Sequence, residues 1–276
     1  REDGLGLLAE ISEDLRLTES GLKKGHVNVP KYRAMYLDAA LKNNQLLSIE
    51  KNKEFKGMVR NMKTIEDSDY EVPEALNSIM RSYQKNGFLW LKTLRENGFG
   101  GILADDMGLG KTIQVLVFYE QFVSKDKPSL IVCPSSLMYN WMSEIEKFKI
   151  GVDAVCVTGT QEVRKEIIQE NHELYITTYD YLRRDVELYM PMEFEYIVLD
   201  EAQFIKNPKT KNAQSVKALK SKHRLALTGT PIENSLSELW SIFDFLLPGY
   251  LYSLNYFTKN FEKPIQTVSY THLTLP

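Results

Sequence analysis

The stretch ILADDMGLGKTIQVL, Ile102–Leu116, decides the fold of this chain. It reads as a short apolar strand, a turn with two glycines, and Lys-Thr opening an amphipathic helix. In such a unit the backbone N–H groups of the turn and the N-terminus of the helix direct partial positive charge into one concavity. The stretch therefore predicts a phosphate-binding loop inside a strand–loop–helix unit.

The residues of this loop have distinct expected roles. Gly108 and Gly110 permit the backbone conformation, Lys111 would reach the β- and γ-phosphates of a nucleotide, and the Thr112 hydroxyl would bind Mg²⁺. Asp105 stands where the common pattern has its first glycine, and an ordinary glycine turn is the alternative. The expected nucleotide contacts here are Asp106, Met107, Gly108, Leu109, Gly110, Lys111 and Thr112.

A second motif, YIVLDEAQ (Tyr196–Gln203), places two carboxylates at the end of an apolar strand. Ligands of open α/β sheets bind at the carboxyl ends of the strands. Asp200 is expected to hold Mg²⁺, and Glu201 is expected to polarise the attacking water. A carboxylate at a strand end is otherwise a cap or turn residue. Lys111, Asp200 and Glu201 are thus the predicted catalytic residues.

Around these motifs, short apolar runs alternate with helix-period segments, a pattern typical of βαβ units. The fold class predicted is α/β, a doubly wound, mostly parallel sheet of the P-loop NTPase type. The expected strands are 100–104, 129–134, 153–158, 174–178, 196–200 and 224–230. The expected helices between them include 112–123, 138–147, 162–170 and 236–246.

Three regions are predicted along the chain. Residues 1–75 form a mostly helical N-terminal accessory region, because YRAMYLDAALKN (Tyr32–Asn43) has apolar residues at helical spacing. The turn-rich EDSDYEVP (Glu66–Pro73) favours a boundary near residue 75. Residues 76–265 form the ATP-binding lobe. Residues 266–276 are a tail, interpreted as truncated or foreign because VSYTHLTLP has no charge and no periodicity.

Two further motifs carry weaker signals. Gln84, in MRSYQKNGFLWL, has an amide that could read the adenine edge, or it is a polar residue on an amphipathic helix. Thr228 and Thr230 end the run RLALTGT, where their hydroxyls could contact a γ-phosphate and couple two lobes, or TGTP is a plain turn.

Composition limits the other function classes. The 276 residues are 43% hydrophobic and 26% charged, with a net charge of −3, so no global positive field attracts nucleic acid. The run Lys206–Arg224 is locally basic and could flank DNA, although a solvated helix face is the simpler interpretation. Tyr139 and Trp141 could stack on bases but are more typical of a core. Cys133 and Cys156 indicate reduced thiols, and no stretch predicts a membrane span.

Taken in order, QKNGFLWL, ILADDMGLGKTIQ, CPSSLMYNW, ITTYDYLR, DEAQ and LTGTPIENSLSELWSIFDFLLPG resemble the Swi/Snf-type helicase-like ATPases of the second helicase superfamily. The resemblance covers about residues 78–265, and YRAMYLDAAL is similar to the bacterial branch. The resemblance implies that the sheet is of the recombinase-like type, and Asp105 is then usual for the family. The fourth position of DEAQ is more commonly His, which puts contacts through Gln203 in doubt.

The resemblance also implies partners. Pro134, Ser135 and Ser136 match a first DNA-contacting motif, and Thr178 and Tyr179 match a second. The family has a second motor lobe that supplies an arginine finger, worth roughly 10³ to 10⁵ in rate. This chain is expected to stop before that lobe, so it should bind ATP and Mg²⁺ and turn ATP over poorly.

The function expected from the resemblance is the first lobe of a DNA-stimulated ATPase that translocates along duplex DNA without sequence preference, in the bacterial cytoplasm at the nucleoid. Two alternatives stay open. One is a strand-separating helicase, and the other is an isolated nucleotide-binding or protein-docking module.

Overall fold

A computed structural model describes residues 6, 9, 11–13, 15, 26, 28–42, 50–63, 80–106, 108–122 and 126–265. The chain divides into two compact units, Arg1–Glu71 and Val72–Pro276. The turn-rich segment at the predicted boundary and the predicted tail, 266–276, lie outside the described residues.

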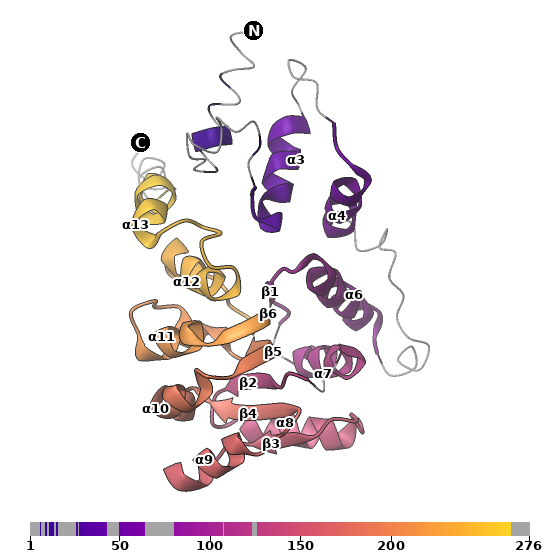
Figure 1. The fold of residues 1–276 in the computed structure, drawn as a ribbon, viewed down its shortest axis with the longest axis vertical. Helices are drawn as coiled ribbons and strands as arrows, with labels where there is room; N and C mark the ends of the chain where they lie inside the picture. The colour runs from indigo at the N-terminus through magenta and orange to yellow at the C-terminus, as the bar shows by residue number, and fades with distance from the viewer. Residues whose placement is uncertain are drawn as a thin grey trace, which may run out of the picture. The chain divides into compact units, whose positions relative to one another are not determined.

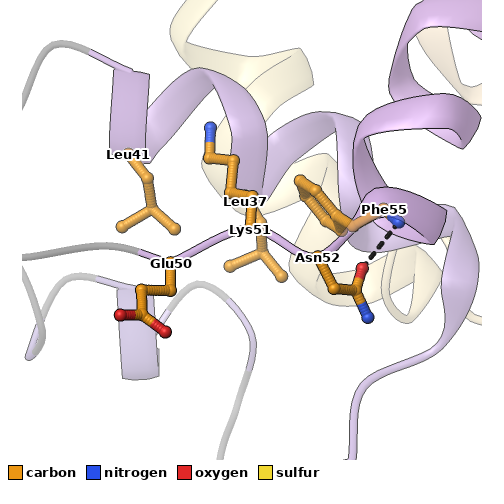
Figure 2. A pocket seen from close by; sticks show the side chains of 6 residues that line it. All are labelled: Leu37, Leu41, Glu50, Lys51, Asn52 and Phe55. Atoms are coloured by element: carbon orange, nitrogen blue, oxygen red, sulfur yellow. Dashed lines mark hydrogen bonds between the residues drawn. The ribbon is translucent and has the colours of Figure 1, made fainter.

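The described part of the N-terminal unit is mostly helical. It contains a 3-10 turn η1 (Lys31–Arg33) and the helices α3 (Ala34–Lys42) and α4 (Lys53–Lys63). Asn52 accepts a hydrogen bond from the backbone N–H of Phe55 at 2.8 Å, which caps the start of α4. A pocket of about 310 Å³ lies between these helices. Figure 2 shows Leu37, Lys51, Asn52 and Phe55 among the side chains that line it.

The second unit is built on a six-stranded sheet of order β1-β6-β5-β2-β4-β3 in which every neighbouring pair is parallel. The strands are β1 (Gly101–Leu103), β2 (Ser129–Cys133), β3 (Ala154–Cys156), β4 (Leu174–Thr178), β5 (Glu193–Leu199) and β6 (Lys220–Leu227). The predicted doubly wound α/β fold is confirmed. β6 begins earlier than expected, because its polar first half pairs with Glu193 and Phe194 at the amino edge of the sheet.

Helices cover both faces of this sheet. They are α6 (Ser82–Asn97), α7 (Lys111–Phe122), α8 (Met138–Lys147), α9 (Gln161–Gln169), α10 (Tyr179–Tyr189), α11 (Lys211–Ala218), α12 (Leu236–Leu246) and α13 (Leu254–Phe257). Figure 1 shows α6, α7 and α8 along one side and α9, α10, α11 and α12 along the other. Such double cover explains why every residue of β2 and β4 is buried.

Local sequence signals position several of these elements. Threonines cap three helices: Thr160 accepts from the N–H of Val163, Thr178 from that of Tyr181, and Thr210 from that of Ala213. Cys133 and Cys156 are free thiols, as expected. Among the helices of the described residues, none combines the length and apolar character needed to cross a membrane.

Candidate functional site

The predicted phosphate loop connects β1 to α7 at the carboxyl edge of the sheet. Gly108 and Gly110 have φ angles of +84° and +74°, in the left-handed region that side chains disfavour. A Cβ on Gly110 would also lie 2.7 Å from the Gln84 amide nitrogen and would displace that side chain. Backbone conformation therefore favours glycine at both positions, and at Gly110 the contact with Gln84 adds to this preference. Met107, the remaining loop position, lies outside the described residues.

Lys111 and Thr112 open α7, as the motif predicts. The Lys111 ammonium donates to the backbone carbonyls of Asp105 and Asp106, at 2.7 and 3.2 Å. The side chain thus folds back over its own loop and holds the loop curved. The ammonium lies beside the helix N-terminus, where an anion would be bound.

Helix α6 supports the loop from the other side. The Tyr83 hydroxyl and the Gln84 amide both donate to the carbonyl of Leu109, at 3.0 and 3.2 Å. The oxygen of the Gln84 side-chain amide accepts from the backbone N–H of Arg81 at 2.9 Å. Gln84 therefore lies against the phosphate loop, with both ends of its amide engaged inside the chain. Its role in reading adenine stays a prediction.

Asp200 follows β5 and is largely buried. Its two carboxylate oxygens accept from the Trp141 indole N–H at 2.9 Å and from the Glu201 N–H at 3.0 Å. Burial raises the pKa of Asp200, while the hydrogen bond from Trp141 and the charge of Lys111 lower it. Asp200 and the loop that carries Lys111 both follow parallel strands and lie at the carboxyl edge of the same sheet.

Glu201 has a left-handed backbone, with φ of 50° and ψ of 57°. A residue other than glycine adopts this conformation at a cost in free energy. The Glu201 carboxylate accepts from the Gln203 amide at 2.6 Å. The strained backbone and this contact fix where the carboxylate lies.

Gln203 links the end of β5, which carries YIVLDEAQ, to the end of β6, which carries RLALTGT. Its amide oxygen accepts from the Thr228 hydroxyl at 3.0 Å, and the Thr228 oxygen accepts from the N–H of Thr230 at 3.1 Å. Thr228 is fully buried and Thr230 is exposed. A continuous hydrogen-bonded path therefore runs from Glu201 to Thr230. This path was not predicted, because its central contact joins residues 25 positions apart.

A second link between these segments was also not predicted. The Lys206 ammonium lies 3.0 Å from the Glu233 carboxylate and 3.4 Å from that of Glu238. Glu238 also accepts from the backbone N–H groups of Glu233 and Asn234 at 2.9 and 3.3 Å. Burial raises the pKa of Glu238, but the hydrogen bonds and the Lys206 charge outweigh it and lower the pKa to about 2. Glu238 thus organises the loop after Thr230.

The predicted DNA contacts divide into two groups. Ser135 and Ser136 are exposed between β2 and α8, beside the half-buried Pro134. Thr178 is buried and caps α10, and the buried Tyr179 donates its hydroxyl to the carbonyl of Asp200 at 2.8 Å. The side chains of this second pair face inward. A role for all five residues in binding DNA stays a prediction.

The structure also shows where the aromatic residues Tyr139 and Trp141 and the basic run Lys206–Arg224 lie. Trp141 is fully buried and belongs to the core, whereas Tyr139 is exposed, so the expected core position is wrong for Tyr139. The basic run does not form one helix face, because it extends from the turn after η2 (Ala202–Ile205) through α11 and into β6. Four of its cations have internal partners: Lys206, Lys217, Lys222 and Arg224.

The sheet order, the glycine loop that follows β1 and opens a helix, and the carboxylates that follow the central strand β5 place the chain in the class of P-loop α/β proteins. Comparisons with known proteins refine this class. The family model described as SNF2-related domain matches residues 83–274, and the one described as bacterial SNF2 helicase associated matches residues 1–73. The chain belongs to the SNF2 family.

Relatives and solved structures agree with this assignment. An uncharacterized ATP-dependent helicase of Mycoplasma pneumoniae is 40% identical over 248 residues, which are 86% of this chain and 23% of that protein. The TATA-binding protein-associated factor mot1 of Aspergillus fumigatus is 35% identical over 95% of this chain and 15% of its own length. This chain therefore spans less than a quarter of either relative.

Among solved structures, the Sulfolobus solfataricus SWI2/SNF2 ATPase core in complex with dsDNA is 44% identical. It matches with a TM-score of 0.63 over 68% of this chain and 40% of that one.

Proposed function

We propose that this chain is the ATP-binding first lobe of a DNA-stimulated ATPase that translocates along duplex DNA. The observation that carries the proposal is that the loop with Lys111 and the strand end with Asp200 and Glu201 both lie at the carboxyl edge of one parallel sheet, in a chain of the SNF2 family. We propose that residues 1–75 form a helical accessory region, that residues 76–265 form the lobe and that residues 266–276 form a tail.

The residues divide the chemistry between them. The backbone of 106–110 and the N-terminus of α7 bind the phosphates, and Lys111 exchanges its contacts with the loop carbonyls for contacts with the β- and γ-phosphates. Glu201 orients the attacking water and takes up its proton. Gln84 contacts adenine, and Thr228 and Thr230 carry the state of the γ-phosphate to neighbouring segments.

The oxygens of Thr112 and Asp200 would hold Mg²⁺. Each Asp200 oxygen accepts one hydrogen bond and retains capacity for a further partner. Magnesium is usually held by one or two carboxylates together with phosphates and water, so this donor set fits. The ion would neutralise charge developing on the phosphates.

Duplex DNA is the proposed partner, bound through its phosphates by the segments at Pro134–Ser136 and at Thr178 and Tyr179. A second motor lobe would complete the site with an arginine finger, so this chain alone should turn ATP over slowly. The cell compartment proposed is the bacterial cytoplasm, at the nucleoid.

A titration of this chain with a fluorescent ATP analogue and Mg²⁺ tests the nucleotide site. Lys111→Ala should weaken binding by at least about tenfold, because it removes a charge-assisted contact. Glu201→Gln should bind as tightly as the unchanged chain and should abolish hydrolysis in the protein that carries both lobes. Equal loss of binding in both variants would show that the roles are wrongly assigned.

The alternatives predict other results. A strand-separating helicase would displace one strand of a duplex in an ATP-dependent manner, which a translocase need not do. A binding module without turnover would show no DNA-stimulated hydrolysis even when both lobes are present.

A further inference from the structure

We propose that Gln114 is a positioning residue for the phosphate-binding loop and acts through the carboxylate of Asp105. The inference rests on the proposed nucleotide function, and it names a residue outside the loop that sets the geometry of Lys111. Gln114 lies in the first turn of α7 and its side chain is fully buried.

The contact closes the loop at its two ends. The Gln114 amide nitrogen donates to the Asp105 carboxylate at 2.9 Å and lies 3.4 Å from the carbonyl of Gly110. Asp105 follows β1, and Gly110 precedes α7. One side chain therefore binds both the first and the last residues of the turn.

Asp105 passes this restraint to Lys111. Its side chain is held by Gln114, while its backbone carbonyl receives the Lys111 ammonium at 2.7 Å. Fixing the Asp105 carboxylate therefore fixes the carbonyl that holds the ammonium. Asp105 can therefore connect Gln114 to Lys111. A glycine at this position could not, because it has no carboxylate for the Gln114 amide to bind.

The orientation of the Gln114 amide supports this assignment. Its oxygen is buried and has no hydrogen-bond partner among the described residues, which is an unfavourable state for a polar atom. Rotating the amide would turn that oxygen toward the Asp105 carboxylate and would replace an attraction with a repulsion. The amide nitrogen therefore stays bound to Asp105 although this orientation leaves the amide oxygen without a hydrogen bond among the described residues.

Helix α6 is shaped to accept this arrangement. A Cβ on Gly87 would lie 1.8 Å from the Gln114 amide oxygen, so any side chain there would displace the amide. Gly87 is in the same helix as Gln84, which holds Leu109. The glycine of QKNGFLWL thus provides space for the residue that restrains the loop.

A reciprocal exchange of amide and carboxylate tests the contact. Gln114→Glu sets a carboxylate against the Asp105 carboxylate and should weaken binding of a fluorescent ATP analogue by about tenfold or more. Asp105→Asn should bind within about threefold of the unchanged chain, because its amide oxygen still accepts. The double variant restores a donor opposite an acceptor and should recover most of the affinity.

Hydrogen–deuterium exchange gives a readout that needs no nucleotide. Gln114→Leu keeps the buried volume and removes the donor, so the amides of 104–110 should exchange faster while those of β2 and β5 stay unchanged. The Asp105→Asn and Gln114→Glu double variant should restore slow exchange in the loop. If the unchanged chain binds no nucleotide, the proposed function fails, and this exchange pattern still decides the inference.

Three results would overturn the inference. These are unchanged binding and loop exchange in Gln114→Glu, a double variant as impaired as Gln114→Glu, or faster exchange in Gln114→Leu spread over the whole sheet. The last would show that Gln114 acts only through core packing.

Discussion

The hydrogen bond from Trp141 to Asp200 should be worth about 2 kcal/mol to the folded state. The indole N–H and the carboxylate are both buried and lie 2.9 Å apart. A hydrogen bond to a charged group contributes about 1.5–3 kcal/mol, and its loss leaves a buried acceptor unsatisfied. Trp141→Phe should therefore destabilise the chain by this amount plus the contribution of the cavity left by the smaller ring.

A double-mutant cycle separates the two contributions. Trp141→Phe, Asp200→Ala and the double variant are unfolded in urea, followed by circular dichroism because the fluorescence changes with the tryptophan itself. The coupling energy should be about 1.5–3 kcal/mol, since the cavity contribution appears in both arms and cancels. A coupling below about 0.5 kcal/mol would refute the reasoning, because it would mean that water replaces the indole.

The same substitution has a consequence for pH. Burial already raises the pKa of Asp200, and the hydrogen bond from Trp141 is among the interactions that oppose this rise. Without the indole the pKa rises further, so ionising the proposed Mg²⁺ ligand needs a higher pH. The midpoint of Mg²⁺-dependent nucleotide binding should move to higher pH in Trp141→Phe, and a midpoint that stays in place would contradict this step.

Three further predictions concern stability and DNA. Burial lowers the pKa of His223 to about 4, below its unfolded value of 6.5, so the unfolded state binds the proton first. Stability should then fall by on the order of 3 kcal/mol as the pH drops from 6.5 to 4, and His223→Phe should flatten that part of a pH series of urea melts. Arg164→Met leaves the Asp185 carboxylate, bound at 2.6 and 2.9 Å, buried without its partner. It should cost about 3–5 kcal/mol in a urea melt, and Asp185→Leu in the same chain should recover most of it. Duplex DNA should bind weakly and alike for unrelated sequences, with a salt slope of about −0.9 per phosphate contacted, and a preference above about tenfold would indicate a base-reading element.

The sequence predicted those parts of the fold that depend on short-range pattern. Each strand was identified because burial on both faces requires continuous apolar residues, as in LIVC and YIVL. The beginning of β6 was missed because Lys220–Arg224 is polar, and its strand character comes from pairing with β5. The loop glycines were predicted because a backbone with positive φ favours glycine, which can be recognised in the sequence.

The side-chain interactions that organise the site could not be predicted in this way, because they join residues far apart in the sequence. Gln203 with Thr228, and Lys206 with Glu238, meet only after β5 and β6 have paired. The basic character of Lys206 suggested an exposed position, whereas two carboxylates 27 and 32 residues further on make its burial possible. Tyr179 likewise matched a surface motif, yet its ring is buried and its hydroxyl bonds to the backbone of Asp200.

The position of β1 in the sheet gives the two halves of the site unequal stiffness. β5 is central, with β2 and β6 on its two sides, whereas β1 is three residues long and ends the strand order beside β6. An end strand opens by breaking one ladder, and a central strand opens only when two are broken, so the two differ in the free energy of local opening. The carboxylates after β5 therefore stand on a strand held from both sides. The loop after β1 stands on a strand held from one side within the described sheet, so its stability depends more on the side chains that bind it, such as Gln84 and Gln114.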